Sequence, residues 1–230
     1  IPELPSTEAA IDAGRKLIES TAEWKRGKDY EHGIVRTFSK SKGVDDGAGW
    51  YCRVSEHGSD DATFEELWKY LGEEHARHEN QYIKVVKKAT LVKEISRNQA
   101  VWSMYYEFPT FGVSPRVFTA LQIAHLQVDT TADKRTGLFI QIPVDLSDEP
   151  ELAAKEGKGV KGHYVSVEQF KELDNGKVEW RMATSSSPGG RIPSFLVEST
   201  MPSQIAADVP HFLTWLHAMR KKSMSTEPVS

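Results

Sequence analysis

The sequence predicts an α+β protein in which a bent antiparallel sheet is covered by helices, above all by a long C-terminal helix. Two observations lead to this fold class. Apolar and polar residues alternate over most of residues 85–184, the period of strands that bury one face and expose the other. Residues 205–219 instead carry apolar side chains at helical spacing.

The composition limits the classes of function. The 230 residues carry 29 Lys and Arg against 33 Asp and Glu, a net charge of −4, whereas a nucleic-acid-binding protein normally gathers a basic excess on one face. We therefore expect no nucleic-acid partner. A single cysteine, Cys52, excludes an intramolecular disulfide and is typical of a reducing compartment, so we expect a cytoplasmic protein. Residues 1–222 are expected to form one domain and residues 223–230 a disordered tail.

The predicted elements follow one another as helix, two strands, helix, a long run of strands and a terminal helix. In chain order they are helix 7–24, strands 30–39 and 50–55, helix 63–82, strands 84–95, 99–108, 116–129, 138–144, 161–173 and 177–184, and a helix that ends at about residue 222.

The first helix is expected to be capped by Thr7, with apolar residues recurring at helical spacing behind it. In strand 50–55, Trp50 shares a face with Cys52 and Val54, while Arg53 lies on the opposite face. This alternation is typical of a sheet that is wet on one side.

Helix 63–82 is predicted from a stripe at positions i, i+3, i+4 and i+7 that begins at Phe64. Asp60 or Asp61 is the expected cap, and Gly72 is expected to break or kink the helix. The segment from His75 to Glu79 lacks the HExxH spacing of a zinc helix, so it is interpreted as a solvated helix face.

The later strands are predicted by their alternating faces. Residues Leu138, Ile140, Ile142 and Val144 would line one inward face. Asn175-Gly176, between the last two strands, is a strong signal for a tight hairpin.

Aromatic side chains gather on the faces that this pattern places inside. They are Trp50, Trp102, Tyr106, Phe108 and Trp180 on the strands, with Phe212 and Trp215 on the C-terminal helix. Such a set either fills a core completely or lines a cavity of ligand size, since ligand pockets are mostly apolar with a few placed polar groups. Periodicity alone leaves both interpretations open.

Two segments resemble a known family. Residues 180–198, which read WRMATSSSPGGRIPSFLVE, are similar to the end of a START (steroidogenic-acute-regulatory-related lipid transfer) domain, where a Pro-Gly-Gly-x-Ile-Pro-x-aromatic-Leu-Val stretch leads into the last helix. Residues 106–109 (YEFP) and 114–118 (SPRVF) resemble the family's strand, loop and following strand. The order of elements agrees over residues 7–222, and the chain looks most like a fungal START-like family of unknown function.

The resemblance implies a helix-grip fold, in which the curved sheet grips the C-terminal helix around a hydrophobic cavity for one lipid. It implies a binding protein without enzymatic activity, cofactor or metal, which we expect to be a monomer. The lid would be the C-terminal helix and loop 109–115, with Phe111 and Val113 as gate residues and transient contact with a membrane surface. Val117 and Gln122 stand where many START domains carry Asp and Arg, so ligand identity is not carried over.

The expected ligand-binding residues are mainly large side chains on the inward faces: Trp102, Met104, Tyr106, Phe118, Trp180, Met182, Phe212 and Leu216. Two polar residues are added as contacts for a ligand headgroup. Arg116 flanks the expected gate, and His125 shares the odd-numbered face of its strand with Leu121 and Ile123.

Two other functions stay open at this point. The same fold could serve a cyclase-like or hydrolase-like enzyme, which needs an acid/base pair inside the cavity; His125 with Glu107 or Arg116 is the candidate pair. The domain could also be a regulatory module whose cavity senses a ligand without transferring it.

Overall fold

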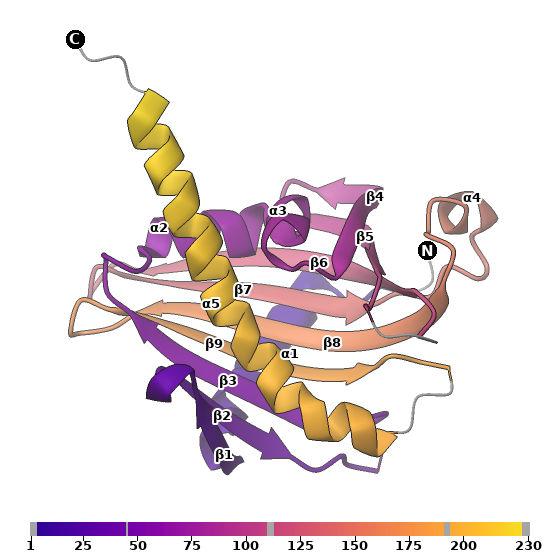
Figure 1. Cartoon of the computed structure of the whole chain (residues 1–230), viewed down its shortest axis with the longest axis horizontal. Helices are drawn as coiled ribbons and strands as arrows, with labels where there is room; N and C mark the ends of the chain where they lie inside the picture. The colour runs from indigo at the N-terminus through magenta and orange to yellow at the C-terminus, as the bar shows by residue number, and fades with distance from the viewer. Residues whose placement is uncertain (1–3, 45, 110–112, 191–193, 227–230) are drawn as a thin grey trace.

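The computed structural model describes residues 4–44, 46–109, 113–190 and 194–226, and one sheet with helices on both faces dominates it (Figure 1). The sheet has nine strands in the order β1-β2-β3-β9-β8-β7-β6-β5-β4, and neighbours in this order pair antiparallel. The predicted α+β class, with a long C-terminal helix packed on an antiparallel sheet, is confirmed.

The elements occupy most of the described residues. The strands are β1 Lys25–Tyr30, β2 Val35–Lys40, β3 Trp50–His57, β4 Val86–Ser96, β5 Gln99–Tyr106, β6 Arg116–Asp129, β7 Lys134–Pro143, β8 Val160–Glu172 and β9 Val178–Ser187. The helices are α1 Thr7–Ser20, α2 Phe64–Leu67, α3 His75–Tyr82, α4 Pro150–Ala153 and α5 Ser194–Thr226, with short turns η1 Thr21–Glu23, η2 Glu31–Gly33 and η3 Trp68–Glu73.

The sheet curls where β7 ends at Pro143. Beyond that point the first residues of β6 pair directly with the first residues of β8 in parallel, from Arg116 opposite Val160 to Phe118 opposite Gly162. A Cβ at Gly162 would lie 2.4 Å from the Phe118 ring, so this glycine leaves the space that the ring occupies.

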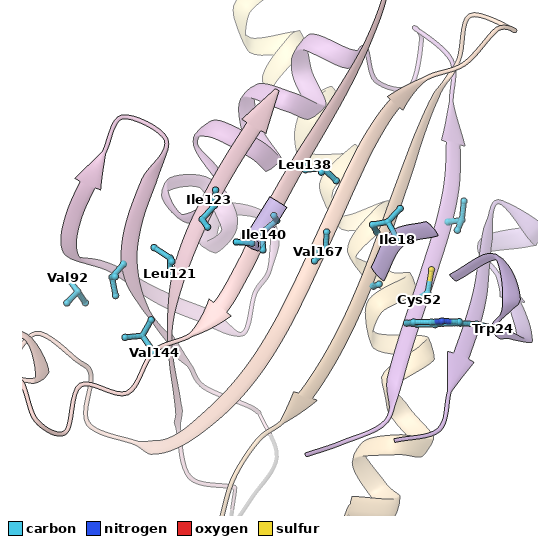
Figure 2. Packing of buried hydrophobic residues seen from close by; sticks show 14 of the residues in the cluster. Ile18, Trp24, Cys52, Val92, Leu121, Ile123, Leu138, Ile140, Val144 and Val167 are labelled. Atoms are coloured by element: carbon cyan, nitrogen blue, oxygen red, sulfur yellow. The ribbon is translucent and has the colours of Figure 1, made fainter. Parts of the chain in front are cut away.

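Helix α1 packs on one face of the sheet over a dry hydrophobic cluster, shown in Figure 2. Gly14 lets the helix come close, because a Cβ there would lie 3.0 Å from Ile140 Cδ1. The helix is capped by Ser6, whose Oγ accepts a hydrogen bond from the Ala9 backbone N–H at 3.2 Å. The predicted cap, Thr7, is wrong by one residue, since Ser6 is the last residue with extended backbone before the helix.

The predicted inward stripe Leu138, Ile140, Ile142 and Val144 packs in the hydrophobic cluster under α1, on the sheet face opposite the C-terminal helix. Trp50 joins this cluster too, with its ring centroid 6.3 Å from that of Trp24. Both faces of these strands are buried, so a continuous apolar stripe marks the more tightly packed face and not the face toward a ligand.

The opposite face is covered by α5 and by the segment α2–η3–α3 (Figure 1). A capping box between Thr63 and Glu66 starts α2, so the expected Asp60 or Asp61 cap is wrong. The predicted interruption near Gly72 is confirmed as a π-helical turn, η3, before α3 begins. Trp68 lies over both Gly72 and Gly137, where added Cβ atoms would come within 2.6 and 2.4 Å of its ring.

Helix α5 crosses this face of the sheet, and its C-terminal end projects beyond it (Figure 1). It continues to Thr226, past residue 222 where the sequence predicted its end. Arg220 is bound to Glu66 of α2, with Nη2 and Oε2 2.5 Å apart, and so fastens the helix to the body. Among the described residues, no helix is both long enough and apolar enough to cross a membrane.

Candidate ligand-binding cavity

A cavity of about 440 Å³, partly open to solvent at Lys84, Gln204 and His211, lies between the sheet face opposite α1 and the helices α3 and α5. A cavity of about 150 Å³ is large enough to hold a benzene molecule, so this space has room for roughly 18 non-hydrogen atoms. A hollow of about 750 Å³ between β4 and α4 is larger, but most of its walls are exposed side chains such as Lys93 and Glu151. It is a surface groove and not an internal site.

Four of the predicted ligand-binding residues line the cavity. They are Tyr106, Phe118, Trp180 and Met182. The rings of Tyr106 and Phe118 meet edge to face with centroids 5.2 Å apart, and α5 adds Ile205 and Ala207 to the wall. Together these side chains give the cavity a largely apolar surface.

The other predicted apolar residues lie behind this wall. Phe212 and Leu216 belong to the packed cluster under α5, where the Phe212 ring meets Trp180 at 5.5 Å between centroids. Trp102 and Met104 pack against α3 in a separate cluster. The structure therefore places these four in the core that supports the cavity.

Neither predicted headgroup residue lines the cavity. Arg116 is buried, and it donates from Nε to the Pro188 carbonyl at 2.9 Å and from Nη1 to the Ser114 carbonyl. His125 lies on the α1 side of the sheet, with Nε2 3.3 Å from an Arg15 nitrogen, where burial and the Arg15 charge lower its pKa. Glu107 is exposed, so the acid/base pair suggested for an enzyme does not converge.

Of the two predicted gate residues, the structure describes one. Val113 is half-buried beside the start of β6, and Phe111 lies outside the described residues.

A buried charged pair lies near the centre of the sheet. The Arg53 side chain from β3 is 1% exposed, and its Nη2 lies 3.3 Å from Glu168 Oε2 of β8. Trp180 donates from Nε1 to the same oxygen at 2.6 Å, and the Arg53 guanidinium lies over the Trp180 ring at 4.0 Å. Two guanidinium nitrogens of Arg53, Nε and Nη1, have no hydrogen-bond partner among the described residues.

A second charged pair comes from α3. His75 Nδ1 lies 3.1 Å from the Leu71 carbonyl oxygen, and His75 Nε2 lies 3.3 Å from Glu79 Oε2. Both ring nitrogens face acceptors, which favours the doubly protonated imidazolium. Burial lowers the pKa of His75, but the bond to Glu79 and its charge outweigh this effect and raise the pKa above its usual value. The Tyr106 hydroxyl donates to the other Glu79 oxygen at 2.9 Å.

Asp208 of α5, which is half-buried, is the third carboxylate on the cavity wall. It forms no hydrogen bond or ion pair with any other residue that the structure describes. Burial raises the pKa of Asp208 to about 7; the nearby charge of Arg53 opposes this shift, and the carboxylates of Glu168 and Glu79 add to it.

Sequence reasoning missed these polar residues for identifiable reasons. Arg53 was assigned to a wet face of its strand, and the His75–Glu79 segment to a solvated helix face; both interpretations are wrong, because α3 and α5 cover that side of the sheet. The sequence did contain a signal for Asp208. Asp208 directly precedes Val209 of the apolar stripe and shares a face of the helix with Gln204 and His211, so a polar face lies beside the apolar one.

Comparison with solved structures shows the same fold in three human proteins. StAR-related lipid transfer protein 5 has a TM-score of 0.72 at 15% identity, over 94% of this chain and 100% of that chain. STARD10 has a TM-score of 0.67 at 13% identity, over 98% and 87%. The lipid transfer and protein localization domain of StarD13 (DLC2) has a TM-score of 0.61 at 13% identity, over 93% and 98%. The predicted resemblance to START domains is confirmed at the level of the fold.

Sequence comparison places the chain in a family. No curated protein sequence matches it. The model of the family described as "Protein of unknown function (DUF3074)" matches residues 50–216, a span that includes Arg53, His75, Glu168 and Asp208. The chain belongs to the DUF3074 family and has a START-like fold.

Proposed function

We propose that this protein binds one apolar or amphiphilic molecule, such as a single-chain lipid, in the cavity between the sheet and helices α3 and α5, and releases it unchanged. The observation that carries the proposal is the cavity of about 440 Å³, with an apolar wall that includes Phe118, Met182 and Ile205 and with charged groups beside it. Ligand pockets are typically apolar concavities of roughly 300–1,000 Å³ with a few placed polar groups.

The size of the cavity selects among lipids. Room for roughly 18 non-hydrogen atoms suits one alkyl chain or a compact ring system. A lipid with two long acyl chains exceeds this space.

The expected affinity follows from the apolar surface that the ligand buries. Burial of a twelve-carbon chain contributes roughly 10 kcal/mol at about 0.8 kcal/mol for each methylene group. The loss of free motion offsets at least about 4 kcal/mol of this gain. The remainder, at most about 6 kcal/mol, corresponds at best to a dissociation constant of about 10–100 μM.

The comparisons support a lipid or lipid-like ligand. Two of the similar structures are named as a lipid transfer protein and a lipid transfer domain. The ligand of this chain reaches its cavity, in our proposal, by movement of α5 and of loop 109–115 with its gate residues Phe111 and Val113. Arg116 supports this assignment, because it ties Ser114 to Pro188 and so joins that loop to the segment that leads into α5.

One observation favours a second function, catalysis on a bound ligand. His75, Glu79 and Asp208 are ionisable groups inside the cavity, which is where an enzyme would keep an acid and a base. A chemical change in a ligand recovered after incubation, absent with Asp208→Asn, would favour the enzyme. Recovery of the unchanged ligand supports the carrier.

The test uses a neutral apolar probe, 1,6-diphenylhexatriene, which fluoresces when it leaves water. We expect saturable binding of one probe per chain. Ala207→Phe places a ring into the cavity, whereas Ala218→Phe puts the same ring on an exposed position of the same helix. The first variant should weaken binding at least tenfold and the second should leave it unchanged.

Circular dichroism and thermal unfolding establish that both variants are folded. Equal binding by the Ala207→Phe and Ala218→Phe variants would contradict the proposal, because the probe would then bind outside the cavity.

A further inference from the structure

Among the side chains of the cavity wall that are not exposed to solvent, carboxylates outnumber cations. The two buried cations each have their own carboxylate, since Arg53 is paired with Glu168 and His75 with Glu79. Asp208 is a third carboxylate on the same wall, without a partner among the residues that the structure describes. When Asp208 is ionised, the cavity therefore lacks one positive charge.

No other titratable group on the cavity wall pairs with Asp208 among the residues that the structure describes. The titratable side chains that line the same cavity are Arg53, His75, Glu79, Tyr82, Lys84, Tyr106, Tyr164, Glu168 and His211. Lys84 and His211 are exposed to solvent, and the tyrosines are neutral, since burial raises the pKa of Tyr82, Tyr106 and Tyr164 well above the usual value. None of these groups supplies the missing buried charge.

Unpaired polar atoms point independently to a polar group of a ligand. Tyr82 is 8% exposed and Ser166 is 4% exposed, both line the cavity, and neither hydroxyl has a hydrogen-bond partner among the described residues. A buried polar group without a partner is costly, so such groups are usually completed by a ligand or by ordered water. Each hydroxyl oxygen can accept a hydrogen bond.

The donor and acceptor pattern distinguishes among headgroups. An ammonium group has three donors and no acceptor, which matches one carboxylate and two hydroxyl oxygens. Arg53 Nε and Nη1, which also have no hydrogen-bond partner among the described residues, are donors, and an ammonium group leaves them as they are. A carboxylate headgroup would add a fourth negative charge to Glu79, Glu168 and Asp208. A hydroxyl headgroup would be accepted but would leave the charge of Asp208 without a counterion.

On the basis of the proposed function, we propose that the polar end of the ligand is a protonated amine that binds Asp208. The protein therefore selects long-chain or similarly apolar amines over alcohols and acids of equal length. Tyr82 and Ser166 accept the remaining ammonium hydrogens, and the alkyl part lies along Phe118, Met182 and Ile205.

The test compares three twelve-carbon probes, dodecylamine, dodecanol and dodecanoate, below their micelle-forming concentrations. Each displaces 1,6-diphenylhexatriene from the full chain at pH 8. We expect dodecylamine to bind at least tenfold more tightly than dodecanol and at least a hundredfold more tightly than dodecanoate. As the pH falls from 8 to 5, Asp208 takes up a proton and the preference for the amine should disappear.

Two variants locate the preference. In Asp208→Asn, the ratio of the affinity for dodecylamine to the affinity for dodecanol should fall at least tenfold. Asp148→Asn, the same change at an exposed position, should behave as the wild type. Equal affinities of wild type for the three probes, or an amine preference that survives in Asp208→Asn, would overturn the inference. If wild type still binds diphenylhexatriene in that case, the proposed function remains supported. A wild-type chain that binds none of these molecules would overturn both.

Discussion

Replacing Asp208 with asparagine should stabilise the unliganded protein at neutral and alkaline pH. The carboxylate lies in the cavity with no partner among the described residues, so ionising it costs free energy in the folded state that it does not cost in the unfolded chain. Asparagine has nearly the same shape and carries no charge. The gain in stability would be an example of a binding residue that is retained at the expense of stability.

The magnitude follows from the pKa of Asp208, which burial raises from 3.8 to about 7. Because the folded state holds this proton more tightly than the unfolded state, the stabilising effect of the proton is complete below pH 4 and is lost as the pH rises to about 7. Each unit of pKa corresponds to about 1.4 kcal/mol, so the full loss is about 4 kcal/mol. Water in the cavity screens part of the charge, and we expect a gain of about 2–4 kcal/mol for Asp208→Asn at pH 8.

The assay is urea unfolding of wild type, Asp208→Asn and Asp148→Asn at half-unit intervals from pH 4 to pH 8.5. The difference in the free energy of unfolding between Asp208→Asn and wild type should be near zero at pH 4 and should grow up to about pH 7. Asp148→Asn, which changes an exposed residue, should show no such growth. A difference that is constant with pH, or a variant less stable than wild type at pH 8, would refute the reasoning.

Two further predictions concern other buried ionisable groups on this side of the sheet. Arg53→Met should lower the free energy of unfolding by about 3–5 kcal/mol at pH 7, because it leaves Glu168 buried without its cation. Adding Glu168→Gln should recover part of that loss. Urea unfolding that shows a loss below about 1 kcal/mol for Arg53→Met would contradict this prediction. Burial lowers the pKa of His57 to about 4. The unfolded chain therefore binds a proton at His57 more tightly than the folded protein does, and the free energy of unfolding of wild type should fall by about 3 kcal/mol between pH 6.5 and pH 4. A His57→Gln variant whose free energy of unfolding falls as much over the same pH range would refute this role of His57.

The order and type of most elements could be predicted because they depend on local pattern, although β1 and α4 were missed and the predicted strand 30–39 runs across η2 into β2. Period-two alternation located strand β6 at residues 116–129, as observed, and the Asn175-Gly176 signal correctly separated β8 from β9. The interruption near Gly72 was also predictable, since glycine is a poor helix former and here leaves space for Trp68.

Which face of each strand meets the cavity could not be predicted in this way. Alternation shows that Ile140 and Gln141 point to opposite sides, but it does not show which side is packed and which is hollow. The more apolar side proved to be the packed layer under α1, whereas Gln141 lines the cavity. The same reasoning placed His125 inside, although it lies on the α1 side.

The charged groups of the cavity converge from distant parts of the chain. Arg53, His75, Glu168 and Asp208 come from β3, α3, β8 and α5, and no local spacing relates them. Their common environment is produced by the curl of the sheet and by the path of α5 across it. Such a site becomes visible when the fold is known.

Native mass spectrometry of the full chain tests the central claim most directly. Wild type and the Ala207→Phe and Ala218→Phe variants would be purified identically, incubated with an equimolar mixture of dodecylamine, dodecanol and diphenylhexatriene, and desalted. We predict one bound molecule per chain, released on denaturation with its mass unchanged, for wild type and Ala218→Phe and none for Ala207→Phe. A wild-type chain that stays bare, or an adduct equally abundant on Ala207→Phe, would contradict a ligand-binding cavity between the sheet and helix α5.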